Sequence, residues 1–158
     1  MLNAQLQRQL PGLILAATDW AIAQEASARS LGRSLNPEEA DEAVFVGVAF
    51  PEKVRLCIVS AMPKPDHPLL VDAMTQTDFL SDGTLGLALG HAIFVLEGHE
   101  CHRWLLRHEL RHVVQYEHAG SIGRFLQEYL EQVLSVGYRD APLEVDARRY
   151  EKRMGMTG

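Results

Sequence analysis

The stretch His108-Glu109-Leu110-Arg111-His112 decides how the rest of this chain is arranged. It lies inside a segment of helical pattern from Glu100 to Ala119. Histidines four positions apart fall on one face of a helix, about one turn apart, so His108 and His112 can reach a single Zn²⁺ ion. Glu109 stands beside them and can take a proton from a zinc-activated water without being a ligand itself. The stretch therefore predicts a metal site on a helix, with Glu109 as the general base.

An HExxH pattern also arises by chance, about twice in a hundred chains of this composition if residues are placed independently. The competing interpretation is an exposed charged helix face, on which Glu109, Arg111 and the neighbouring histidines are simply solvated. The helical setting favours the metal site. Tetrahedral zinc then needs a third protein ligand, and a catalytic site leaves the fourth position to water.

The composition fits an ordinary globular chain and argues against several kinds of partner. The 158 residues are 47% hydrophobic and 23% charged, which predicts a single domain over 1–158, with a helical part over 1–50 and a sheet and metal-site part over 51–158. The net charge of -6 gives no basic field for phosphate backbones, so we expect no nucleic acid partner. Cys57 and Cys101 lie far apart and form no thiolate zinc site.

The chain also lacks an apolar run of about 18 residues, the length that a membrane-spanning helix needs. We therefore expect no membrane association and a soluble, cytoplasmic protein. A secretion signal over residues 8–23 is the weaker alternative, because Asp19 and Trp20 interrupt it and the segment also fits an amphipathic first helix.

Hydrophobic periodicity and turn residues predict an α+β fold. Asn36-Pro37 and Asp140-Ala141-Pro142 are helix starts, since a capping side chain or an acidic residue precedes a proline that fits the first turn. Helices are expected over about 12–30, 37–46, 68–79, 100–119, 122–136 and 140–153, and strands over 54–59, 84–89 and 91–96. The expected architecture is a small twisted sheet with packed helices, in which the HExxH helix forms the floor of a cleft.

Three stretches together resemble a known family. HELRHVVQYEHAG, the following FLQEYL, and YRDAPLEVDARRYE are similar to small zincin metallopeptidase-like proteins of the minimal gluzincin type. The resemblance covers about Thr84 to Glu151. In that group the two motif histidines and a glutamate on a later helix bind zinc, and the motif glutamate acts as base. The resemblance implies one zinc per chain, held by His108, His112 and Glu144, with Glu109 as the catalytic base.

Two carboxylates near the start of the last predicted helix compete for the position of the third ligand. Glu144 lies in the first turn of the last predicted helix, where any acidic residue is favoured by the helix dipole. Asp146 is its rival, and only one of them can face the metal, because positions two apart on a helix point in nearly opposite directions. The chain departs from the commoner gluzincin pattern, since Leu143 precedes Glu144 and Arg148 stands where an aspartate is usual. Each metal-bound imidazole also needs an oxygen acceptor behind it, which the sequence does not identify.

The remaining expectations concern substrate and chemistry. Tyr138 is a candidate catalytic residue that could donate to the oxyanion of a tetrahedral intermediate, although a tyrosine in such a place more often serves packing. The resemblance implies that residues 91–96 form an edge strand along the cleft, where an extended peptide or protein substrate would pair with its main chain. A plain core strand explains this stretch equally well. The expected function is a zinc-dependent hydrolase of the metallopeptidase type. The alternatives are a non-catalytic zinc-binding interaction or regulatory module and a hydrolase of non-peptide amides or esters.

Overall fold

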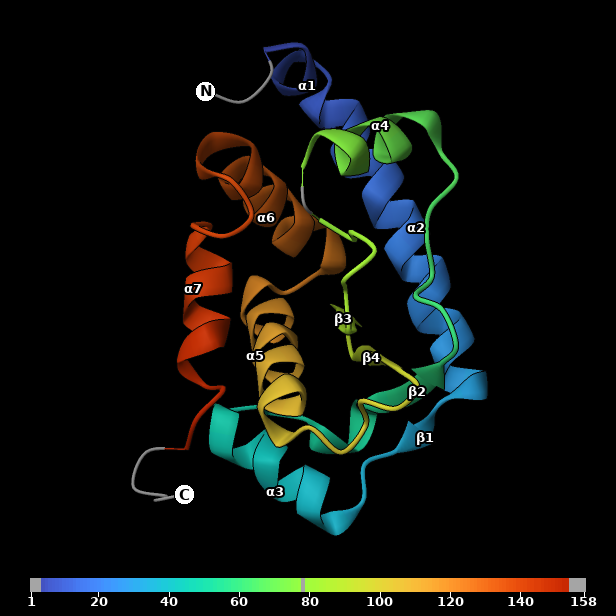
Figure 1. Cartoon of the computed structure of the whole chain (residues 1–158), viewed down its shortest axis with the longest axis vertical. Coiled ribbons are helices and arrows are strands. Elements are labelled where there is room, and N and C mark those ends of the chain that lie inside the picture. Colours follow the sequence, from blue (N-terminus) through green and yellow to red (C-terminus); the bar gives the residue numbers. More distant parts are fainter. Residues whose placement is uncertain (1–3, 78, 154–158) are drawn as a thin grey trace.

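The structure is a computed structural model, and it describes residues 4–77 and 79–153 (Figure 1). The described chain is α+β, as predicted, with seven α-helices and one four-stranded mixed sheet. Its elements are, in order, α1 (Ala4–Arg8), α2 (Leu10–Leu31), β1 (Arg33–Ser34), α3 (Pro37–Val46), a 3-10 turn η1 (Pro51–Lys53), β2 (Arg55–Val59), α4 (Pro68–Gln76), β3 (Gly86–Leu89), β4 (Ala92–Leu96), α5 (Arg103–Ala119), α6 (Ile122–Val136) and α7 (Pro142–Arg149).

The sheet has the strand order β1-β2-β4-β3. β2 pairs in parallel with β4, with Cys57 opposite Phe94, and β3 pairs antiparallel to β4, with Leu87 opposite the same residue. The prediction that residues 91–96 form an edge strand is therefore wrong. β4 is an interior strand, and its continuous apolar run from Ala92 to Val95 is typical of a strand buried on both faces. The edge strand on this side of the sheet is β3.

Two apolar clusters cover the two faces of the sheet. Alternation along β3 places Leu87 and Leu89 in one cluster and Ala88 in the other. The Leu87 face packs mainly against α2, α4 and α6, and the Ala88 face packs against α3 and the buried leucines and valines of α5. Figure 1 shows α5 between α7 and the β3 side of the sheet, and contacts on both sides agree with this view. α5 is thus fixed on one side by the sheet and on the other by α7.

Local sequence signals place most helix ends. α3 begins at Pro37 because the Asn36 side chain accepts a hydrogen bond from the Glu39 N–H at 2.8 Å, while the Glu39 carboxylate accepts from the Asn36 N–H at 2.8 Å. α6 has the predicted bounds, with Ser121 as its cap. α5 begins at Arg103, later than predicted, because a turn in which the His102 N–H bonds the His99 carbonyl precedes it.

Two other helices are shorter than predicted, since α4 ends at Gln76 and α7 at Arg149. Position 78, which falls within the predicted span of the α4 helix, lies outside the described residues. Across the described parts of the chain, no helix combines the length and apolar character that crossing a bilayer requires.

Candidate metal centre

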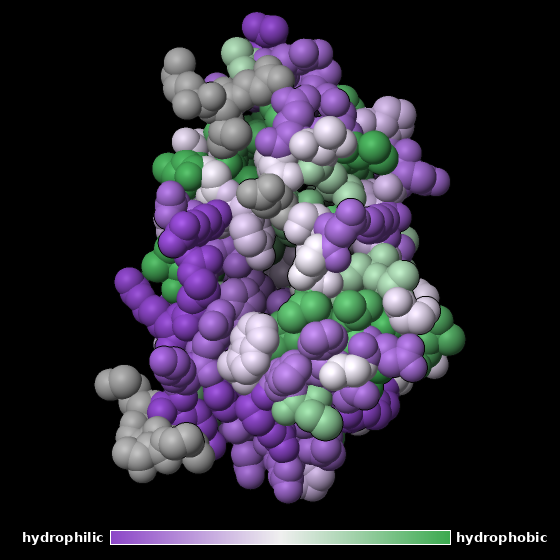
Figure 2. All heavy atoms as spheres, viewed as in Figure 1, coloured by the Kyte–Doolittle hydropathy of each residue, from purple (hydrophilic) through white to green (hydrophobic). Residues whose placement is uncertain are grey.

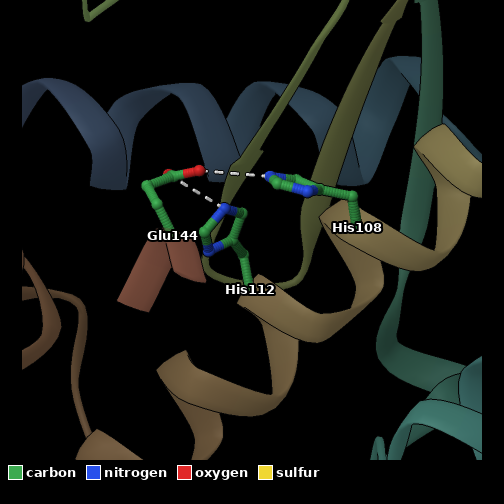
Figure 3. Close-up of side chains that lie close together, drawn as sticks. All are labelled: His108, His112 and Glu144. Atoms are coloured by element: carbon green, nitrogen blue, oxygen red, sulfur yellow. Dashed lines mark hydrogen bonds and ion pairs between the residues drawn. The ribbon is translucent and has the colours of Figure 1, made fainter. Parts of the chain in front are cut away.

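Three side chains from two helices converge on one point (Figure 3). His108 and His112 project from α5, and Glu144 projects toward them from the first turn of α7. The His108 Nε2 atom lies 3.2 Å from Glu144 Oε1, and the His112 Nε2 atom lies 3.1 Å from Glu144 Oε2. One ligand atom from each residue lies within 4.8 Å of the others, so the group could hold a metal ion. Glu144 is only 2% exposed, which places this carboxylate inside the protein.

The spacing of these atoms allows one metal ion to contact all three side chains. Ligands at the usual zinc distances of about 2.0–2.2 Å place neighbouring donor atoms roughly 3.3 Å apart. The two nitrogen–oxygen separations here, 3.2 Å to Glu144 Oε1 and 3.1 Å to Glu144 Oε2, are close to that length, and each imidazole faces a different oxygen of the carboxylate. An ion between the three groups would take the place of the protons that the imidazoles now share with Glu144. The residues therefore fit a zinc ion bound by two nitrogens and one carboxylate.

The position of Glu144 is fixed from α6. The Tyr129 hydroxyl donates a hydrogen bond to Glu144 Oε2 at 2.7 Å. The Gln132 side chain accepts from the Leu143 N–H at 2.9 Å, which ties the start of α7 to the same helix. The periodicity of residues 122–136 predicts Tyr129 on the apolar face of this helix, and its ring does lie in that core. Its hydroxyl was missed because a sequence pattern does not show which end of a buried tyrosine meets a polar partner.

His108 has an acceptor behind it on the C-terminal segment. Its Nδ1 atom lies 2.8 Å from Glu151 Oε2, on the side of the ring away from Glu144. The Arg107 guanidinium donates to the Tyr150 and Glu151 carbonyls at 2.7–3.2 Å, and so holds that segment against α5. A hydrogen bond to Nδ1 leaves Nε2 as the ligand atom and sets the angle of the ring.

His112 is oriented from within its own helix. Its Nδ1 atom lies 2.8 Å from Gln115 Oε1, one turn further along α5. The Gln115 amide then donates to the Leu143 carbonyl and to Asp146 Oδ2, both at 2.9 Å. Gln115 thus connects a histidine of α5 to the helix that carries Glu144. The spacing of three residues from His112 was the available signal for this contact.

Asp146 does not join the three converging side chains. Its carboxylate accepts from Arg111 Nε at 2.8 Å as well as from Gln115, so it lies behind His112. Arg111 also donates to the Val46 carbonyl at 2.8 Å, which joins α3 to the same network. Of the two rival carboxylates, Glu144 is the one that faces the histidines, as expected for positions two apart on a helix.

Glu109 faces a pocket between α5 and β3. Its side chain is buried, and burial raises its pKa above the usual value for a carboxyl group. The pocket is lined by Glu109, His112, Glu144, Tyr138 and residues of β3. A Cβ atom on Gly86 would lie 3.0 Å from Glu109 Oε1, so the absence of a side chain there lets β3 approach this carboxylate.

Tyr138 is the remaining predicted site residue, and it lines this same pocket. Burial and the neighbouring charge of Glu144 raise the pKa of its hydroxyl, so Tyr138 stays protonated at neutral pH and can act as a donor. Figure 2 shows a hollow near the middle of the face, where α5 and β3 lie in Figure 1. The pocket is narrow, at about 40 Å³, by a measure in which one water needs roughly 10–15 Å³. It has room for a few atoms rather than for a whole peptide.

Comparisons with protein-family models, with curated proteins and with solved structures find no match to this chain.

The shared protons make the stability of the metal-free chain depend on pH. Burial lowers the pKa of His108, but the hydrogen bond to Glu144 and the charges of Glu109 and Glu144 outweigh it and raise that pKa to about 9. A raised histidine pKa stabilises the fold fully below the unfolded value of about 6.5, and the stabilisation is lost as pH rises through the folded value. We expect the urea midpoint of metal-free protein, with a chelator present, to fall between pH 6 and pH 9.5.

The variant His108→Gln should lose only part of this decrease, because burial lowers the pKa of His112 but its hydrogen bond to Glu144 and the charge of Glu144 outweigh burial and raise that pKa too. His118→Gln, which changes an exposed histidine near the end of the same helix, should keep all of the decrease. A wild-type midpoint that stays constant or rises over this range would contradict the shared-proton arrangement.

The acceptor behind His108 gives a second prediction. Loss of such a partner typically lowers metal affinity about 10–100-fold. Glu151→Ala should weaken zinc binding by this amount in a competition assay with a fluorescent chelator. Glu151→Gln retains an acceptor oxygen and should lose less, and Glu131→Ala, an exposed change on α6, should bind zinc like the wild type. Wild-type affinity in Glu151→Ala would mean that this contact does not orient the ligand.

Proposed function

We propose that this chain is a zinc-dependent hydrolase that cleaves peptide bonds, with a zincin-like site. The observation that carries the proposal is the convergence of His108 Nε2, His112 Nε2 and the Glu144 carboxylate beside a pocket that Glu109 also lines. Two imidazoles and one carboxylate are a ligand set found in catalytic zinc sites, where the fourth position stays open. Two of the three proposed ligands, His112 and Glu144, line this pocket together with Glu109.

When bound, zinc would polarise a substrate carbonyl and lower the pKa of a coordinated water to about 7. Glu109 is the group that moves the proton. Its buried carboxylate, with a raised pKa, suits a base that accepts a proton at neutral pH and returns it to the leaving amine. The Tyr138 hydroxyl is the candidate donor to the developing oxyanion, because it lines the pocket and stays protonated.

The β3 edge is the proposed place for an extended substrate. In the described part of the chain β3 pairs with β4 alone, so no strand uses the main-chain donors and acceptors of its other edge, which is where we propose that a peptide pairs. Gly86, the first residue of this strand, lies against Glu109. A peptide paired there would pass the proposed base, and only its reacting carbonyl would need to enter the narrow pocket. This moves the proposed substrate strand from residues 91–96 to β3.

The narrowness of the pocket favours one other candidate function. A zinc-binding interaction or regulatory module needs the three ligands but no room for a substrate, and ligands alone do not establish turnover. In such a module Glu109 would have no chemical role. A substitution of Glu109 therefore distinguishes the two functions, because it abolishes hydrolysis by an enzyme and leaves a binding module unaffected.

The substitution Glu109→Gln tests the proposal, because it keeps the size of the side chain and removes the base. We expect peptide hydrolysis by zinc-loaded protein to fall about 10²–10⁴-fold, the usual contribution of a general base, while the bound zinc is retained. Turnover of a mixed peptide library, followed by mass spectrometry, measures the loss. Glu131→Gln, on the exposed face of α6, is the matched control and should leave turnover unchanged. Equal turnover in wild type and Glu109→Gln would overturn the assignment of the base, and no hydrolysis by zinc-loaded wild type would favour the module.

A further inference from the structure

Glu42 is a buried carboxylate on α3, a helix that supplies none of the proposed metal ligands. Its side chain is only 10% exposed, and its two oxygens face two arginines. Oε2 lies 3.1 Å from Arg107 Nη1, and Oε1 lies 3.7 Å from Arg153 Nη1. A carboxylate is costly to bury unless it is paired. Both of its partners belong to, or bind, the segment of residues 150–153 that follows α7, so Glu42 lies where that segment attaches.

Arg107 connects Glu42 to the main chain of this segment. One side of its guanidinium, Nη1, bonds the Glu42 carboxylate. The other side, Nε and Nη2, donates to the Glu151 carbonyl at 3.1 and 2.7 Å, and Nε also donates to the Tyr150 carbonyl at 3.2 Å. A guanidinium carries its donors in a rigid planar fork, so an anchor on one side sets the direction of the others. Glu42 thus helps to set the position of the main chain at Glu151.

Side chains of the same segment also pack on α3. The Tyr150 ring meets the Phe45 ring edge-on at 6.4 Å between centroids, and the Arg153 guanidinium lies 4.4 Å from the centre of the Phe45 ring. Phe45 follows Glu42 by three positions, so the two residues lie on one face of the helix. Figure 1 shows the chain after α7 running down beside α3, and these contacts agree with the view. One face of α3 therefore holds residues 150–153 in place.

Glu151 is the residue of this segment that contacts a proposed metal ligand. Its Oε2 atom lies 2.8 Å from Nδ1 of His108, the residue next to Arg107 in α5. Arg107 binds the Glu151 carbonyl and His108 binds its carboxylate, so neighbouring residues of α5 hold both groups of one glutamate. A shift of the main chain at Glu151 would move its carboxylate relative to the His108 ring. The contacts thus form a continuous path from Glu42 through Arg107 and Glu151 to His108.

The charge of Glu42 also leaves the Glu151 carboxylate free for His108. Among residues 4–77 and 79–153, Glu42 is the one carboxylate that forms an ion pair with Arg107. Without that partner a largely buried guanidinium would need another negative charge. Glu151, whose carbonyl Arg107 already binds, carries a carboxylate in the same residue. An ion pair between Arg107 and this carboxylate would compete with the contact to His108.

We infer that Glu42 is a positioning residue for the metal ligand His108, acting through Arg107 and the carboxylate of Glu151. The inference rests on the proposed zinc centre, and its tests measure metal binding, so an absence of hydrolysis would bear on the peptidase function alone. It gives α3, in the N-terminal part of the chain, a role in metal affinity in addition to its packing against α5.

The substitution Glu42→Gln tests this role, because it keeps the size of the side chain and removes the charge. In a competition assay with a fluorescent chelator, we expect zinc affinity to fall by about 3–10-fold. This is less than the loss expected without Glu151 itself, because the acceptor is displaced and not removed. Glu39→Gln is the matched control on the same helix. Glu39 is also buried but pairs with Arg33, and glutamine can keep its place in the cap of α3, so this variant should bind zinc like the wild type.

A double-mutant cycle separates positioning from a general structural role. In Glu151→Ala protein the carboxylate is absent, so adding Glu42→Gln should lower zinc affinity by less than about twofold further. An equal loss in both backgrounds would overturn the inference, because Glu42 would then act by another route. If Glu42→Gln does not fold, Arg107→Lys replaces it in the cycle. Lysine keeps a charge beside Glu42 but lacks the planar fork that binds the two carbonyls, so the same pattern is expected.

The visible absorption of cobalt-loaded protein gives a second readout, because it depends on the geometry of the metal ligands. Glu42→Gln should shift the spectrum in the same direction as Glu151→Ala, and Glu39→Gln should leave it as in the wild type. Wild-type zinc affinity or a wild-type cobalt spectrum in Glu42→Gln would overturn the positioning role while the zinc centre stands. A wild type that binds neither metal would overturn the zinc centre, and this inference with it.

Discussion

The structure depends on a buried carboxylate, Glu144, held between two imidazoles. An unpaired charge in a protein interior costs several kcal/mol, so every oxygen and nitrogen around it needs a partner. His108 and His112 face this carboxylate, and the Tyr129 hydroxyl donates a hydrogen bond to it. Burial alone would raise the pKa of Glu144, but the two histidines outweigh burial and keep that pKa well below its usual value. This requirement brings α5, α6 and α7 together at one point, and the sheet fixes α5 from its other side. The same arrangement of donors suits a cation in place of the shared protons.

Much of the fold could be predicted because its signals are local. The Asn36-Pro37 cap and the long apolar face of α6 give helix ends close to those observed. The order of the strands could not be predicted, since pairing β2 in parallel with β4 depends on how the intervening α4 segment packs and not on any strand's own pattern. β1 has only two residues and no periodicity to detect. The wrong assignment of an edge strand to residues 91–96 follows from this missing long-range information.

The candidate site, too, could be predicted from the sequence only where the signal is local. The HExxH spacing places His108 and His112 on one helical face by geometry alone, whereas Glu144 depended on a resemblance and had Asp146 as a rival. The structure separates the two carboxylates, with Glu144 facing the histidines and Asp146 behind them on Arg111 and Gln115. The acceptors behind the rings were not predicted, because Glu151 reaches His108 across a tertiary contact 43 residues away in sequence.

The most direct test of the account is the metal content of untagged protein purified without added metal, measured by mass spectrometry on wild type, His112→Ala and Glu144→Ala. We expect about one zinc per chain in the wild type and a loss of that zinc in both variants, with folding checked by circular dichroism. Zinc retained by folded Glu144→Ala would place the third ligand elsewhere. A wild type that binds no zinc even after incubation with Zn²⁺ would contradict the proposed metal centre.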